Sequence, residues 1–179
     1  MRNIIRISAG TAAVLLAAGT VVFTASAAQA ADDTTGANAS VNGGVLSISA
    51  PTAVTFPLAN PGTTSEAAAE GIAVTDTRAG TVGWAASVST TDFVSVADPT
   101  RSIGAGALGY TPATAVETGT LTLVKSDTIT GSTAGSAVQT ASGVTGNNSA
   151  TWSAALTLTV PSDALAATDY QATVTHSVL

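Results

Sequence analysis

Small apolar side chains alternate with hydroxyl side chains along much of the chain, and this period of two predicts β-strands that bury one face. The alternation is clearest in residues 152–160 and 170–178 near the carboxyl end, and it recurs in residues 82–89. In residues 170–178 the apolar series includes His176, the single histidine of the chain. The pattern therefore places His176, like both tryptophans, on the apolar face of its strand.

Shorter runs with the same character predict further strands at 45–49, 52–56, 72–75, 93–96 and 120–124. Turn-forming residues separate these runs, and residues 76–80 are predicted to be the hairpin loop between 72–75 and 82–89. Glu66-Ala-Ala-Ala-Glu70 is predicted to form one helical turn that ends at Gly71. Residues 104–119 and 131–149 are predicted to be loops or irregular edge strands.

The composition favours β-structure over helix. Threonine and valine are frequent, their branched side chains suit a pleated surface, and glycine recurs too often for long helices. Short strands separated by turns predict an all-β fold. We expect an antiparallel β-sandwich with Greek-key-like connections, and a barrel is the alternative.

The amino end has the pattern of an export signal. Arg2 and Arg6 precede an uncharged apolar run at 7–25, and Ala28-Gln29-Ala30 supplies small residues before a cleavage site. We therefore predict a signal peptide at 1–30, and an uncleaved membrane anchor is the alternative. Residues 31–42 are polar and are predicted to be a flexible leader, followed by a single β domain at 43–179.

Charge and cysteine content exclude several classes of function. Loss of Arg2 and Arg6 with the signal leaves three basic residues against eleven acidic ones, a net charge of −8. Such a surface repels nucleic acid and anionic lipid, so neither is expected as a partner. The chain contains no cysteine, which excludes disulfides and thiolate metal sites.

The sequence contains no recognisable catalytic motif. No Gly-x-Ser-x-Gly sequence positions a nucleophile, and the acidic residues are scattered rather than paired as a glycosidase requires. No Asp-x-Asp-x-Asp loop indicates calcium binding. We therefore expect neither enzyme activity nor a bound cofactor or metal.

Three segments carry further information: Val74-Thr-Asp-Thr-Arg-Ala-Gly-Thr-Val-Gly-Trp84, Leu156-Thr-Leu-Thr-Val-Pro161 and Tyr170-Gln-Ala-Thr-Val-Thr-His-Ser-Val178. Together they resemble the WxL domain, a module of Gram-positive surface proteins. The chain departs from the family at both Trp-x-Leu motifs. Ala86 stands where the first has leucine, and His176 and Val178 replace the tryptophan and leucine of the second.

The resemblance implies a secreted protein that associates noncovalently with the cell wall, with peptidoglycan as the ligand. The residues at motif positions are then candidates for wall contact: Asp76, Arg78, Trp84, Tyr170, Thr175 and His176. Indole rings stack on sugar faces, but packing within the strands is the favoured explanation for both tryptophans and His176, and a turn-forming role for Asp76. The alternative function is a structural or adhesive surface subunit that assembles with itself or with other exported proteins, because weakly charged edge strands can pair between chains.

Overall fold

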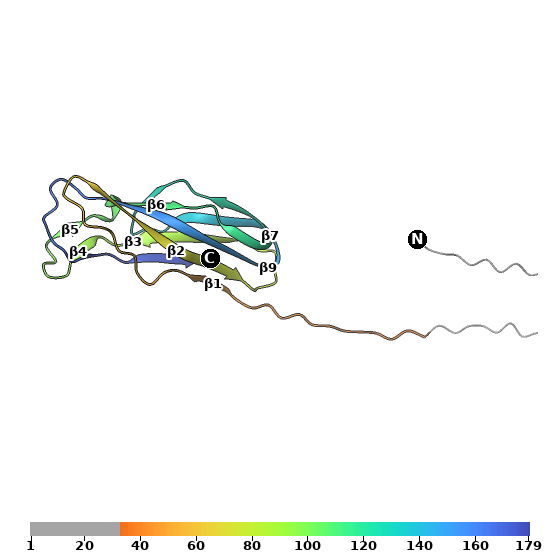
Figure 1. The fold of residues 1–179 in the computed structure, drawn as a ribbon. Coiled ribbons are helices and arrows are strands. Elements are labelled where there is room, and N and C mark those ends of the chain that lie inside the picture. Colours follow the sequence, from red (N-terminus) through yellow and green to blue (C-terminus); the bar gives the residue numbers. More distant parts are fainter. Residues whose placement is uncertain (1–32) are drawn as a thin grey trace, which may run out of the picture. The chain divides into compact units, whose positions relative to one another are not determined.

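The computed structural model describes residues 33–179 (Figure 1), within which Ser40–Leu179 form one compact unit. The expected signal peptide and the first two residues of the expected leader lie outside the described residues. Residues 33–42 are exposed and have no regular secondary structure. Apart from one 3-10 turn, η1 (Ala105–Ala107), the regular elements of the described chain are strands, which confirms the all-β prediction.

The longest strand, β9 (Ser136–Thr159), organises the main sheet (Figure 1). Along one edge it pairs with β2 (Thr64–Asp76) and then with β3 (Trp84–Thr90), both antiparallel. Along its other edge it pairs in the same manner with β6 (Leu108–Pro112) and then β7 (Val116–Lys125). Two consecutive strands thus cover each edge of β9, and their inner side chains share one core.

The remaining strands of this sheet curl it toward closure. β1 (Leu46–Ser49) pairs with β2, and β11 (Val174–Val178) pairs with β3. β1 and β11 lie next to one another, so that the sheet is a nearly closed antiparallel barrel. The barrel, named as the alternative on sequence grounds, describes the main sheet.

Short strands complete the fold at one end of the barrel. β8 (Ile129–Thr130) pairs with β6. A separate three-stranded sheet consists of β10 (Tyr170–Gln171), β4 (Phe93–Ser95) and β5 (Ser102–Ile103), with β4 in the middle.

Alternation along the strands sets the core, as predicted. Trp84 and Trp152 are each only 3 % exposed, and the even-numbered residues from Trp152 to Val160 all point inward. On β11 the inward series is half-buried and includes His176, while Thr175 on the opposite face is exposed. Val82 is the exception, since it precedes β3 and is exposed rather than sharing the buried face of Trp84.

The helical turn predicted at 66–70 is wrong, because these residues belong to β2. Ala67 lies opposite Leu156 and Ala69 opposite Ala154, so that pairing with β9 outweighs the local helix preference of alanine. Gly71 does not end a helix. It adopts a φ of 71° at a register shift between Ala69 and Ile72, where a β-bulge requires a residue free of Cβ strain.

The loop prediction for 131–149 is also wrong, because β9 passes through it from Ser136 as a central strand. Gly143 and Gly146 adopt positive φ and let the strand bend rather than end. Within 104–119, η1 and β6 replace much of the expected irregular chain.

Two further expectations about connections fail. Residues 76–80 do not close a hairpin, since β2 and β3 both run antiparallel to β9 and do not pair with each other. Residues 52–56 form no strand; they belong to an irregular segment that crosses from β1 to β2.

Candidate functional site

A hydrogen-bonded network lies where β2 ends and β3 begins. The Arg78 guanidinium forms a two-point ion pair with Asp76, with Nε to Oδ1 and Nη2 to Oδ2 both at 2.9 Å. Asn148 of β9 donates from Nδ2 to Asp76 Oδ2 at 3.3 Å, and its Oδ1 accepts the Trp84 indole N–H at 2.9 Å. The ion pair thus joins two of the candidate residues, and Asn148 connects it to Trp84.

The network fixes a buried charge. Asp76 is 2 % exposed, and its hydrogen bonds from Arg78 lower the pKa of the carboxyl to about 2 despite burial. Arg78 Nη2 also donates to the carbonyls of Val82 and Gly83, at 3.1 and 3.3 Å. Gly83 itself packs against β9, where a Cβ would collide with the Ala141 carbonyl. The cluster therefore locks residues 77–83 onto the barrel and leaves no free indole face.

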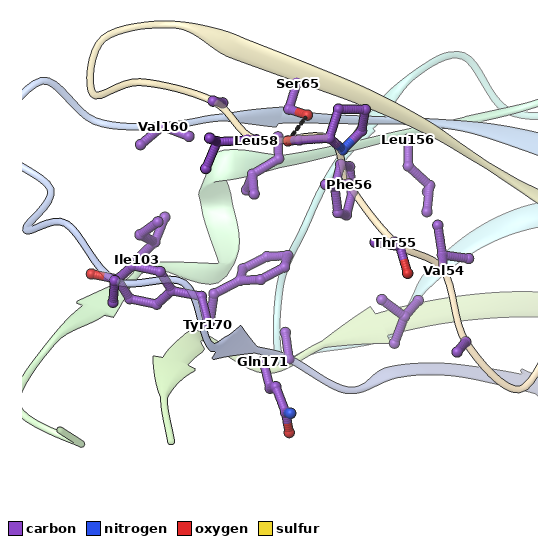
Figure 2. Close-up of a pocket in the computed structure, with 18 of the residues that line it drawn as sticks. Val54, Thr55, Phe56, Leu58, Ser65, Ile103, Leu156, Val160, Tyr170 and Gln171 are labelled. Carbon is purple, nitrogen blue, oxygen red and sulfur yellow. Dashed lines mark hydrogen bonds between the residues drawn. The ribbon is translucent and has the colours of Figure 1, made fainter. Parts of the chain in front are cut away.

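The opposite end of β2 borders an apolar cavity of about 1060 Å³ (Figure 2). Figure 2 shows the labelled side chains around this space: Val54 and Phe56, Leu156 of β9, Val160 just after β9, and Tyr170. The lining comes from the segment 51–61, from residues 164–174, and from inward side chains of both sheets. From the barrel these are chiefly Ala69, Tyr110, Leu156, Leu158 and His176, and from the three-stranded sheet Phe93 and Ile103.

Residues 51–61, called here the cover segment, form one side of this cavity. The Ser65 hydroxyl donates to the Pro57 carbonyl at 2.8 Å, the dashed line in Figure 2. The Phe56 ring meets Phe93 edge to face, with ring centroids 6.3 Å apart. Prolines at 51, 57 and 61 remove backbone donors from the segment, which explains why it does not extend β1 or β2.

Three ring side chains form a polar chain beside the cavity. The Trp152 indole N–H donates to the Tyr110 hydroxyl at 3.4 Å, and that oxygen lies 3.2 Å from His176 Nε2. Burial raises the pKa of Tyr110 and lowers the pKa of His176. His176 is therefore held in its neutral form at pH 7, with Tyr110 protonated.

The outer face of the paired strands β3 and β11 carries hydroxyl groups. Ser87 and Ser177 lie opposite each other with their Oγ atoms 2.9 Å apart, and Ser89 lies opposite Thr175. Thr175 and Ser177 are exposed, while the two serines of β3 are half-buried. We call these four residues the hydroxyl ribbon.

The six residues predicted from the sequence do not form one site. Asp76, Arg78 and Trp84 belong to the buried network, Tyr170 and His176 line the cavity, and Thr175 lies on the outer face. Sequence reasoning missed three features: Tyr110, Asn148 and the cover segment. Tyr110 and Asn148 lay in segments expected to be irregular, and only the alternation in Leu108-Gly-Tyr-Thr-Pro112 could have indicated an inward Tyr110.

Within residues 33–179, no group of three His, Asp or Glu side chains is placed to hold a metal ion. Over the same residues, no helix has the length and apolar character needed to cross a membrane. No protein-family model, curated protein or solved structure matches the chain.

Proposed function

We propose that this chain is a secreted domain that associates noncovalently with the bacterial cell wall, with peptidoglycan as its ligand. The proposal rests on the resemblance to WxL domains, and one observation of the structure supports it. The strands that carry the two altered Trp-x-Leu motifs are direct neighbours, with Ala86 opposite Val178 and Val88 opposite His176. The outer face of these two strands, next to both motifs, is the hydroxyl ribbon.

The chemistry of the hydroxyl ribbon suits a neutral glycan. Each serine or threonine hydroxyl both donates and accepts, as do the hydroxyl and amide groups of a glycan strand. The ribbon carries no charge, so a ligand needs no charged group to bind it. The side chains of the ribbon are small, which lets an extended polymer approach the sheet closely.

The aromatic candidates Trp84 and Tyr170 are not arranged to stack on a sugar. Trp84 is 3 % exposed and its N–H is bound to Asn148, so its indole supports the core. Tyr170 is half-buried and donates its hydroxyl to the Leu165 carbonyl at 2.7 Å. We therefore assign wall contact to the hydroxyl ribbon, with Thr175 at its exposed centre.

Co-sedimentation with purified peptidoglycan tests this function. The native chain should pellet with the wall material in a saturable manner. The double variant Thr175→Val with Ser177→Ala should bind about tenfold more weakly, because it removes the exposed hydroxyls and keeps the strand. A matched control, Thr64→Val with Thr159→Val, removes a hydroxyl pair 3.4 Å apart on another part of the outer face and should bind normally.

Two outcomes would contradict the proposal. If the native chain does not pellet above a protein of similar charge, wall binding is wrong. If the ribbon variant pellets as well as the control variant, the ribbon is not the contact surface.

A second candidate function, assembly as a surface subunit, is favoured by the free edge of β7. Within the described residues β7 pairs only with β9, and its side chains are largely exposed, including Val116 and Val124. The carboxyl-terminal strand is a weaker candidate, since β11 is hydrogen-bonded to β3 and lies beside β1. Sedimentation velocity over a range of concentrations should show self-association that Val124→Lys suppresses; a monomer at all concentrations would contradict it.

A further inference from the structure

The cavity beneath the cover segment is lined without any charged side chain. The chain carries eleven acidic and five basic residues, yet no Asp, Glu, Lys or Arg lines this space. A charged group entering it would lose hydration and find no opposite charge in return. The cavity therefore favours uncharged molecules, and its volume lies at the upper limit for sites that bind small organic molecules.

Several polar side chains line the cavity, and among them Tyr110 and His176 form a hydrogen-bonded pair. Trp152 donates to the Tyr110 hydroxyl, and one hydrogen bond joins that hydroxyl to His176 Nε2. If Tyr110 is the donor, the neutral imidazole carries its proton on Nδ1, for which the described residues provide no partner. If His176 is the donor, the Tyr110 hydroxyl proton has no partner instead. Either arrangement leaves one donor beside the cavity for a hydroxyl or carbonyl oxygen of a ligand.

The cover segment is attached in a way that permits access. Across residues 51–59, no backbone group is hydrogen-bonded to another backbone group of the described chain. The Pro57 carbonyl is held by Ser65, and the remaining attachment is apolar packing of half-buried side chains such as Val54 and Phe56. Displacing residues 51–59 therefore breaks few hydrogen bonds, whereas displacing a barrel strand would break its whole row of backbone hydrogen bonds to the neighbouring strand.

We propose that this cavity binds an uncharged, largely apolar small molecule, whose single hydroxyl or carbonyl group contacts the Tyr110–His176 pair, with the cover segment closing over it. The site is separate from the hydroxyl ribbon, which lies on the outer face of the sheet. It does not depend on the proposed wall association, and either function can fail while the other holds.

Binding of an uncharged fluorescent probe, N-phenyl-1-naphthylamine, to the full chain provides the first test. We expect saturable binding and displacement of the probe by 1-dodecanol. Dodecanoate at pH 8 has the same chain length but a carboxylate, and it should compete at least tenfold more weakly. The absence of saturable probe binding, or equal competition by the alcohol and the carboxylate, would overturn the proposal.

A substitution that fills the cavity locates the site. Ala172 is half-buried in the lining, and Ala172→Trp should weaken probe binding at least tenfold. Ala155→Trp places the same side chain on the outer face of β9 and should leave binding unchanged. Equal probe affinity in both folded variants would show that the probe binds elsewhere and would overturn the assignment.

The single histidine supplies a measurement that needs no substitution. Because the imidazole signals of the chain come from His176 alone, NMR spectra of the native protein report directly on the cavity. Addition of 1-dodecanol should shift these signals with the same saturation curve as probe displacement. Unchanged imidazole signals at saturating alcohol would overturn the proposal even if Ala172→Trp fails to fold.

Discussion

The two ends of the barrel interior each contain a tryptophan in a hydrogen-bonded network, but the two networks differ in how completely their polar groups are paired. At the end where β2 meets β3, Trp84 lies over a network in which Asp76, Arg78 and Asn148 satisfy one another. At the other end, Trp152 leads through Tyr110 to His176, and that chain stops beside a cavity. A network whose polar groups are all paired holds a loop in place. A network with one unpaired donor leaves that donor free to bind a ligand.

The covering segments differ in the same way. Residues 77–83 are held by an arginine that bonds to a carboxylate and to two carbonyls, and by a glycine packed on β9. The cover segment depends on apolar packing and the single bond from Ser65. The difference indicates that one end stabilises the fold and that the other is suited to exchange a ligand.

Removal of the Asp76 carboxylate should have the largest effect on stability. Asp76→Ala leaves the Arg78 guanidinium and the Asn148 amide without their shared partner, at a cost of about 3 kcal/mol in the free energy of unfolding. The exposed pair Asp98–Arg101 offers a matched control, and Asp98→Ala should cost less than about 1 kcal/mol. Urea unfolding followed by tryptophan fluorescence measures both, and similar losses would mean that the two ion pairs do not differ.

Acid should weaken the same end selectively. The pKa of Asp76 is about 2 in the folded protein against 3.8 ordinarily, so the unfolded chain binds the proton more tightly. The resulting stability, about 2 kcal/mol, is present above pH 5 and is lost as the pH falls from about 4 toward 2.

The free energy of unfolding measured at pH 5 and pH 3 should therefore fall less in Asp76→Asn than in the native chain. Some acid dependence should remain in the variant, because Asp98 and Asp169 also have lowered pKa values. An unchanged pH slope in Asp76→Asn would contradict the assigned role of Asp76.

At the cavity end, Tyr110→Phe should cost about 1 to 2 kcal/mol. It removes one oxygen and leaves the buried Trp152 indole N–H without an acceptor. The imidazole signals of His176 should shift in the same variant, because the hydroxyl lies 3.2 Å from Nε2. Thermal unfolding and NMR check the two effects, and unaltered His176 signals would show that the contact is not made in solution.

Truncation of single side chains in the cover segment should have the smallest effect on stability. Phe56 is half-buried, so that Phe56→Ala should lower stability by about 1 kcal/mol, well below the cost of emptying a core position. Leu58→Ala, at a position 91 % exposed, should change stability by less than about 0.5 kcal/mol. Urea unfolding compares the two, and a loss above about 3 kcal/mol for Phe56→Ala would mean that the segment belongs to the core.

The sequence predicted those features that depend on strand alternation. The inward positions of Trp152 and His176 follow from a period of two, and the structure has them inward. The predictions from sequence were wrong where pairing with a distant segment decides the secondary structure. Ala67–Ala69 suits a helix equally well, and only β9 opposite makes it a strand.

The candidate site was harder to predict for the same reason. Arg78 lies two residues from Asp76, so that local sequence alone brings these two charges close together. The Tyr110–His176 contact joins residues 66 positions apart, and the cavity depends on a proline-interrupted segment whose path no periodic pattern indicates.

The order of the strands along the chain has a consequence for biosynthesis. β2, β3, β6 and β7 all precede β9, the strand to which each of them is hydrogen-bonded. Until residues 136–159 have been synthesised, β3 and β7 have none of their strand partners, β2 and β6 have only the short strands β1 and β8, and the barrel cannot close. A chain of this design therefore carries four incompletely paired strands until its central strand has been made, and the barrel forms only after that strand is available.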